Sequence, residues 1–200
     1  MLDPKSKGVI KSAVERSARD PAYFCRFFFP AWFPSEMPAF HLGILALRTR
    51  KVEWLDEPIY ADARPFLLEH FRYSADPQDP TSTQLPVFIE ERGSLVMVCD
   101  DYLNEIIPRG FSKTTLVNAA NTHDILTDGQ TFCVYISKSA EHAEMQLGNI
   151  KIELETNRLL QAAYGDLVPS RADPEKWQAD QIQLLNGSIL VARGKGGQVR

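Results

Sequence analysis

The sequence has 200 residues, of which 44% are apolar and 24% charged, so it can bury a core as one domain, alone or with a small appendage. Its net charge of −4 excludes a polycation that coats nucleic acid, although a local basic groove stays compatible. No run of about eighteen apolar residues is present, so we expect no membrane-spanning segment.

The first half of the chain predicts helices interrupted by prolines. Residues 1–37 form a helical and aromatic lead-in, because Pro30 and Pro34 break the most aromatic segment. A helix is expected from about Pro38 to Arg50. Residues 51–93 look like an insertion, within which the composition of 74–86 is typical of a loop.

The second half alternates strands and helices. Apolar runs at 94–99, 102–107 and 131–137 predict strands, and the last of these is typical of a buried parallel strand. Helices are expected from Lys113 to about Leu126 and over roughly 139–163; the second carries one apolar face made of Ala143, Leu147, Ile150 and Leu154. Residues 180–193 predict a hairpin with a two-residue Asn186-Gly187 turn. This order indicates a βαβ unit in an α/β sandwich with a mainly parallel sheet.

The stretch "IIPRGFSKTTL", residues 106–116, lies between a predicted strand and a predicted helix. It ends in Lys-Thr as a phosphate loop does, but Ile107 and Ser112 stand where the pattern GxxxxGK[ST] has glycines. Ser112 is small enough for a phosphate to approach its backbone if its φ is negative. Arg109 and Lys113 at a helix N-terminus are unfavourable for the helix macrodipole unless an anion binds there. The position therefore favours nucleotide binding over a simple strand-to-helix turn.

The same stretch resembles the deviant Walker A loop of the large terminase subunits of tailed phages, which often reads Pro-Arg-Gly-x-[Gly/Ala/Ser]-Lys-[Ser/Thr]-Thr. Arg109 occupies the arginine position of that loop. Three further segments resemble the family in the same order: "FPSEMPAFHLGIL", "YISKSAEHAEMQLGNIKIELETN" and "WQADQIQLLNGSILVARGKGGQVR". The resemblance covers about 24–50 and 94–200, and leaves 51–93 unmatched.

The resemblance implies a P-loop NTPase fold of the ASCE or RecA-like kind, a three-layer sandwich whose first part is residues 38–200. It implies the ATP-binding portion of a viral DNA-packaging motor that translocates double-stranded DNA into a procapsid. The full protein would be an ATPase with a nuclease domain, acting in the host cytoplasm as a homo-oligomeric ring with a portal protein and a small terminase subunit.

By the same resemblance, the nucleotide site would comprise Pro108, Arg109, Gly110, Phe111, Ser112, Lys113, Thr114 and Thr115. Lys113 would hold the β and γ phosphates of ATP, Arg109 would touch the γ phosphate, and Thr114 would ligate Mg²⁺. Phe40 and His41 would lie against the adenine, or else Phe40 is core and His41 a helix-surface residue. Arg193, Lys195 and Arg200 would contact DNA or a neighbouring subunit, or else belong to a solvated loop.

Up to Arg200 the sequence shows no apolar strand ending in Asp-Glu and no acidic nuclease cluster, so we expect an ATPase domain that is incomplete at its C-terminus. Without a Walker B aspartate and a catalytic glutamate, the 200-residue chain is expected to bind ATP weakly and not to hydrolyse it. Two alternatives stay open: a helicase-like P-loop ATPase, and an assembly module that holds no nucleotide.

Overall fold

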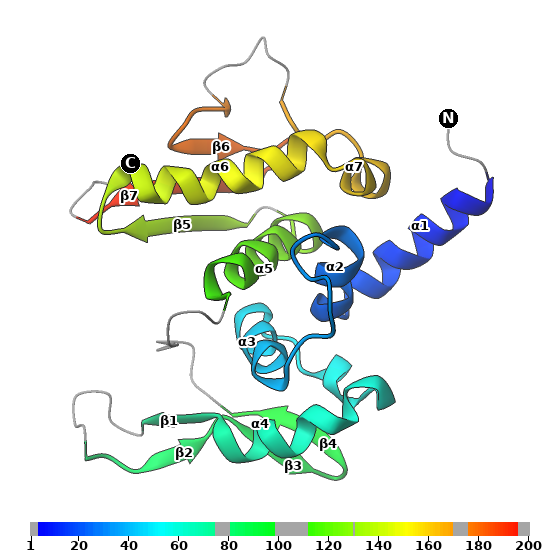
Figure 1. Ribbon diagram of the computed structural model, residues 1–200, viewed down its shortest axis with the longest axis vertical. Coiled ribbons are helices and arrows are strands. Elements are labelled where there is room, and N and C mark those ends of the chain that lie inside the picture. The colour runs from blue at the N-terminus through cyan, green and yellow to red at the C-terminus, as the bar shows by residue number, and fades with distance from the viewer. Residues whose placement is uncertain (1–3, 75–80, 99–111, 130, 170–175, 196–200) are drawn as a thin grey trace.

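The computed structural model describes residues 4–74, 81–98, 112–129, 131–169 and 176–195 and arranges them in three tiers (Figure 1). A small sheet with two helices beside it lies at one end, which we call the sheet end. Helices fill the middle, and two hairpins with a short helix form the other end, which we call the hairpin end. The middle tier joins the two ends.

Three helices of the first half begin the middle tier: α1 (Pro4–Ser17), α2 (Pro21–Phe28) and α3 (Ala39–Thr49). The Asp20 side chain caps α2 by accepting a hydrogen bond from the Tyr23 N–H at 2.7 Å, and Pro21 occupies the first helical position, where it is favoured. The bounds of α3 confirm the helix predicted between Pro38 and Arg50. Phe24 and Phe28 are fully buried and lie 5.1 Å apart between ring centroids.

The hairpin end contains the described residues of the segment 51–93, which the sequence analysis interprets as an insertion. Its elements are η1 (Glu53–Asp56), η2 (Pro58–Ala63), α4 (Arg64–His70), β1 (Arg72–Ser74), β2 (Gln84–Pro86), β3 (Phe88–Glu91) and β4 (Ser94–Met97). β1 pairs with β2, and β3 with β4, both antiparallel. The strand predicted from residue 94 is confirmed, but the prediction of a loop over 74–86 is wrong at its end, because 84–86 pair with 72–74.

The helices beside the sheet are α6 (Ala140–Thr156) and α7 (Arg158–Tyr164), and the strands are β5 (Phe132–Ser137), β6 (Gln181–Gln183) and β7 (Ile189–Gly194). The helix α5 (Lys113–Thr127) lies in the middle tier and packs against α6, so we count it with the sheet end. The sheet order is β5-β7-β6, with β5 parallel and β6 antiparallel to β7. The described strands therefore include one parallel pair, and a mainly parallel sheet is not evident among them. The three-layer P-loop sandwich stays a prediction, and the expected strand at 102–107 lies outside the described residues.

The helix predicted over 139–163 is two helices, α6 and α7, which meet at Asn157. The Asn157 side chain accepts hydrogen bonds from the N–H groups of Leu159 and Leu160, at 3.1 and 3.2 Å, and so starts a new helix. Its amide also donates to the carbonyl of Phe28 at 2.7 Å, which ties this junction to α2. The predicted apolar face is confirmed, since all four of its residues are buried: Ala143, Leu147, Ile150 and Leu154.

The strand β5 is parallel to β7 as predicted, but the prediction that it is buried is wrong. Phe132, Val134 and Ile136 are exposed, whereas Cys133 and Tyr135 are half-buried and pack against the core. Alternate residues of a strand point to opposite faces of a sheet, so only one face of β5 packs inward.

The hairpin between β6 and β7 is confirmed, but its turn is longer than the expected two residues. The Gly187 N–H donates to the carbonyl of Leu184 at 3.0 Å, and the Leu184 N–H donates to that of Ser188 at 2.8 Å. Leu185, Asn186 and Gly187 therefore form the loop. Gly187 has a φ of 90°, which glycine adopts without the steric penalty of a side chain.

Candidate functional site

The N-terminus of α5 is the described part of the predicted phosphate loop. Pro108, Arg109, Gly110 and Phe111 lie outside the described residues, and the description begins at Ser112. Ser112 has φ 49° and ψ 25°, in the left-handed region. The condition stated for a phosphate to approach this backbone, a negative φ, is therefore not met. Glycine adopts the left-handed conformation at little cost, which gives a physical reason for a glycine at this position of the usual loop.

The first turn of α5 carries a positive charge and no negative one. Lys113 is half-buried, Thr114 is exposed and Thr115 is half-buried, and Ser112 makes no side-chain cap. The N–H groups at a helix start and the positive end of the helix dipole both favour an anion. A Lys in this turn opposes the dipole, so a bound anion such as phosphate would relieve the conflict.

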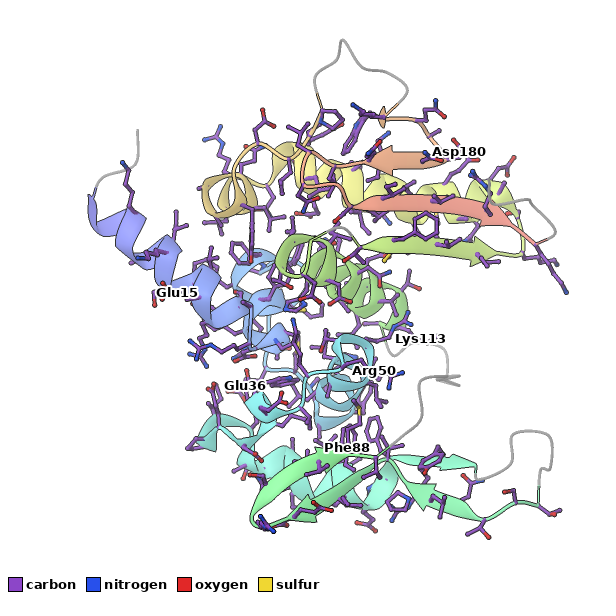
Figure 2. All side chains as sticks on the ribbon, turned by 180° about the vertical axis from the view of Figure 1, so that it is seen from behind. Glu15, Glu36, Arg50, Phe88, Lys113 and Asp180 are labelled. Carbon is purple, nitrogen blue, oxygen red and sulfur yellow. The ribbon has the colours of Figure 1, made fainter. Side chains whose placement is uncertain are left out.

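The helix α5 is firmly held by the rest of the molecule. It packs against α2, α3 and α6, and Leu116, Ala119 and Ile125 are fully buried. The fully buried His123 is hydrogen-bonded through Nε2 to the carbonyl of Ser17 at 2.9 Å. These contacts fix the position of Lys113, which Figure 2 labels at the start of the helix.

A cleft of about 300 Å³ opens beside the first turns of α5, and we call it the α5–α6 cleft. Its walls come from α5, from α6 and from the segment between α2 and α3: Thr114, Thr115, Asn118, Gln146, Asn149, Ile152, Glu153 and Trp32. Trp32 is far from the others in sequence, so no local motif indicates this cleft.

Asn118 is the most buried polar residue of the cleft, with 3% of its surface exposed. Its Nδ2 donates a hydrogen bond to Oε1 of Gln146 at 3.1 Å. Its Oδ1 has no hydrogen-bond partner among the described residues. Buried acceptors are satisfied in the great majority of cases, so the unpaired oxygen is unusual, but almost none of its surface is accessible from the cleft.

The structure does not bring Phe40 and His41 into this cleft. Both lie at the start of α3, where their ring centroids are 4.2 Å apart. His41 is buried with 9% exposure, and Phe40 is partly buried against the core. Their predicted contact with adenine stays a prediction. The partial burial of Phe40 fits the alternative of a core position, but the alternative of a helix-surface position for His41 is wrong, because His41 is buried.

Arg193 is held at the sheet end by Asp180. Its Nη1 lies 2.7 Å from Oδ2 of Asp180 and also donates to the carbonyl of Ala192 at 2.8 Å. Lys195 is exposed just beyond β7, and Arg200 lies outside the described residues. A contact between Arg193 and DNA would have to compete with this ion pair, so Lys195 is the more accessible of the two.

The described part of the site offers one oxygen ligand that suits Mg²⁺. Mg²⁺ in nucleotide sites is held largely by substrate phosphates and water with one or two protein oxygens, and the exposed Thr114 hydroxyl could supply one. Within the described ranges, no group of three or more His, Cys, Asp or Glu side chains is placed to hold a metal ion.

Sequence reasoning missed a buried carboxylate at the base of α2. Asp20 is fully buried; it accepts hydrogen bonds from the Tyr60 hydroxyl at 2.8 and 3.0 Å and pairs with Arg16 at 3.4 Å. Burial, and then the charge of Asp20, raise the pKa of the Tyr60 hydroxyl. These bonds join α1 and α2 to the hairpin end, so the cluster is structural, although the buried Nε of Arg16 has no partner among the described residues.

Comparisons with family models, with curated proteins and with solved structures find no match for this chain. No helix in the described part of the chain is both long and apolar enough to cross a membrane. The function is therefore argued from the site itself and from the motif resemblance.

Proposed function

We propose that the chain is the ATP-binding portion of a viral DNA-packaging motor of the large terminase type, with ATP held at the N-terminus of α5. The observation that carries the proposal is a lysine in the first turn of a well-packed helix that has no acidic residue there and no side-chain cap. This arrangement favours a polyanion such as a triphosphate.

In this proposal Lys113 binds the β and γ phosphates, and the packing of α5 fixes the backbone from which its side chain extends. Thr114 offers its exposed hydroxyl to Mg²⁺, which when bound neutralises charge on the phosphates. Thr115 lines the site beside them. Arg109 is proposed to touch the γ phosphate, on the strength of its place in the motif alone.

The wider function rests on the order of the four resembling segments. We propose that the full protein couples ATP hydrolysis to translocation of double-stranded DNA into a procapsid, with a nuclease domain of its own. Its partners would be a portal protein, a small terminase subunit and further copies of itself in a ring, in the host cytoplasm.

The test is a titration of the 200-residue chain with labelled ATP and Mg²⁺, with and without Lys113→Ala. We expect the substitution to weaken binding about tenfold to hundredfold, since a hydrogen bond to a charged group contributes about 1.5–3 kcal/mol. Lys11→Ala is the matched control, because Lys11 is an exposed lysine on α1.

Equal ATP affinity in the wild type and the Lys113→Ala variant would contradict a nucleotide site at α5. Undetectable binding, in this chain and in a longer protein that contains it, would favour the assembly module.

A further inference from the structure

Glu153 gives the α5–α6 cleft a negative charge. Among the described residues of its lining, this carboxylate is the one charged group, and the other polar groups are hydroxyls and amides. Glu153 is half-buried, and its Oε2 accepts a hydrogen bond from Nδ2 of Asn157 at 2.9 Å. None of the ion pairs between described residues involves it. The lining therefore favours a cation as the occupant.

The cleft also offers oxygens that a ligand can reach. Thr114 and Asn149 are exposed, and Thr115 and Gln146 are half-buried, so part of each residue is open to solvent. Their side-chain oxygens accept hydrogen bonds. Asn118 does not belong to this set, because its unpaired Oδ1 is almost inaccessible. An occupant with a positive charge and several N–H donors matches these groups.

Trp32 adds a flat aromatic wall to the same cleft. Its ring stacks on the buried Phe29, with centroids 4.8 Å apart and planes 18° from parallel, so the indole is held in place on one side. An aromatic face attracts a cation, and a planar guanidinium also stacks on it, which a compact ammonium does not do. The molecule already contains one such contact, since the Cζ atom of Arg16 lies 4.4 Å from the ring centroid of Tyr23. Trp32 therefore favours a guanidinium over an ammonium.

The charge at the start of α5 should control how tightly the cleft holds a cation. Thr114 and Thr115 belong both to the cleft and to the first turn of α5. The positive end of the helix dipole and the charge of Lys113 oppose a cation beside that turn. A polyphosphate bound there would make the local charge negative, so it should strengthen the binding of a cation in the cleft.

We propose that the α5–α6 cleft binds the guanidinium group of an arginine side chain from a partner polypeptide, with Glu153 as its anionic partner and Trp32 as its stacking surface. A polyphosphate at the start of α5 strengthens this binding. This coupling rests on the proposed function, since it needs an anion at α5. Because coupling between two binding sites is reciprocal, the guanidinium in turn strengthens polyphosphate binding by the same factor.

The experiment titrates the 200-residue chain with N-acetylarginine methylamide and with N-acetyllysine methylamide, followed by the NMR signal of the Trp32 indole N–H. Each titration is done without and with saturating inorganic tripolyphosphate and Mg²⁺. Glu153→Gln removes the charge and keeps an oxygen that can accept from Asn157. Glu144→Gln is the matched control, because Glu144 is also half-buried on α6 and does not line the cleft.

We expect the arginine probe to shift the Trp32 indole signal and to bind more tightly than the lysine probe. Glu153→Gln should weaken binding of the arginine probe about tenfold, since it removes a hydrogen bond to a charged group, and Glu144→Gln should leave it unchanged. Tripolyphosphate should raise the affinity for the arginine probe about fivefold or more. Loss of this gain in Glu153→Gln would show that it does not come from direct pairing of the probe with tripolyphosphate.

Equal affinities for the two probes, or an affinity that Glu153→Gln leaves unchanged, would overturn the guanidinium site and leave the proposed function standing. An affinity that tripolyphosphate does not raise, in a chain that binds tripolyphosphate through Lys113, would overturn the coupling. Failure of ATP and tripolyphosphate to bind would overturn the proposed function and the coupling together, and the effect of Glu153→Gln on the arginine probe would then decide the site.

Discussion

At the hairpin end, Leu67, Phe88 and Leu95 pack into a closed core, and the Asp56 carboxylate is paired with Arg64 and with the Leu95 N–H. At the sheet end, the buried Oδ1 of Asn118 has no partner among the described residues, and Phe132, Val134 and Ile136 are exposed. Figure 2 labels Phe88 and Lys113 in these two regions.

The difference between the two ends indicates which region stabilises the fold and which region binds a ligand. A region whose buried groups satisfy one another contributes stability and offers little for a ligand to complete. A region with a polar cleft and an uncapped cationic helix start presents polar groups at its surface that a ligand can complete. We therefore propose that the hairpin end stabilises the fold and that the sheet end binds the nucleotide.

The largest expected effect is on stability at the hairpin end. Phe88 is 1% exposed and lies 5.4 Å from Phe71 between ring centroids. Phe88→Ala should lower the free energy of unfolding by about 3–5 kcal/mol in urea titration, through lost burial and the cavity left behind. Leu85→Ala, at a position 36% exposed in the neighbouring hairpin, should cost far less. Equal costs for the two substitutions would contradict the closed core.

A smaller effect is expected at the sheet end, where a substitution should raise the free energy of unfolding. Ser112→Gly should raise the free energy of unfolding by up to about 1 kcal/mol, because the left-handed conformation costs a residue with a side chain about 1–2 kcal/mol, and the entropy of glycine offsets part of this. Ser139→Gly is the control: Ser139 has φ −124° and caps α6 through the His142 N–H. If Ser112→Gly destabilises as Ser139→Gly does, the left-handed conformation of Ser112 is contradicted.

A third expected effect, confined to alkaline pH, is a slope of stability with pH. Burial, with a smaller contribution from Asp124, raises the pKa of the Cys133 thiol to about 11. As pH rises past the ordinary thiol pKa, the unfolded chain loses its proton first, so stability should fall until the folded thiol also titrates. Cys133→Ser should flatten this fall between pH 9 and about 11 in urea titrations. Parallel slopes for the two proteins would contradict a buried thiol on the inner face of β5.

Local patterns predicted the elements whose signals are local. The placement of prolines indicated α3, and the phosphate-loop motif indicated the start of α5. Periodicity indicated the buried face of α6, and the apolar run at 131–137 indicated β5. It could not show that one face of β5 is exposed, because burial depends on what packs against the sheet. The break at Asn157 was missed because an asparagine within a helical pattern becomes a cap only when its side chain turns back to the backbone.

The two hairpins of the hairpin end were missed because their turns have unusual backbone geometry or join distant residues, and the cleft was missed because its walls are far apart in the sequence. The turn between β3 and β4 places Arg92 at φ 53°, a conformation that sequence patterns associate with glycine or asparagine. The cleft combines Trp32 with residues of α5 and α6, so only the fold brings its walls together. The resemblance named Lys113 and Thr114 but gave no indication of Asn118.

The most direct test of nucleotide binding at the sheet end is backbone amide NMR of the 200-residue chain titrated with ATP and Mg²⁺. The account predicts that the largest shifts fall on residues 112–118 and that the amides of Phe88 and Leu95 stay unchanged. Shifts centred on the hairpin end, or no shifts at millimolar ATP, would contradict it.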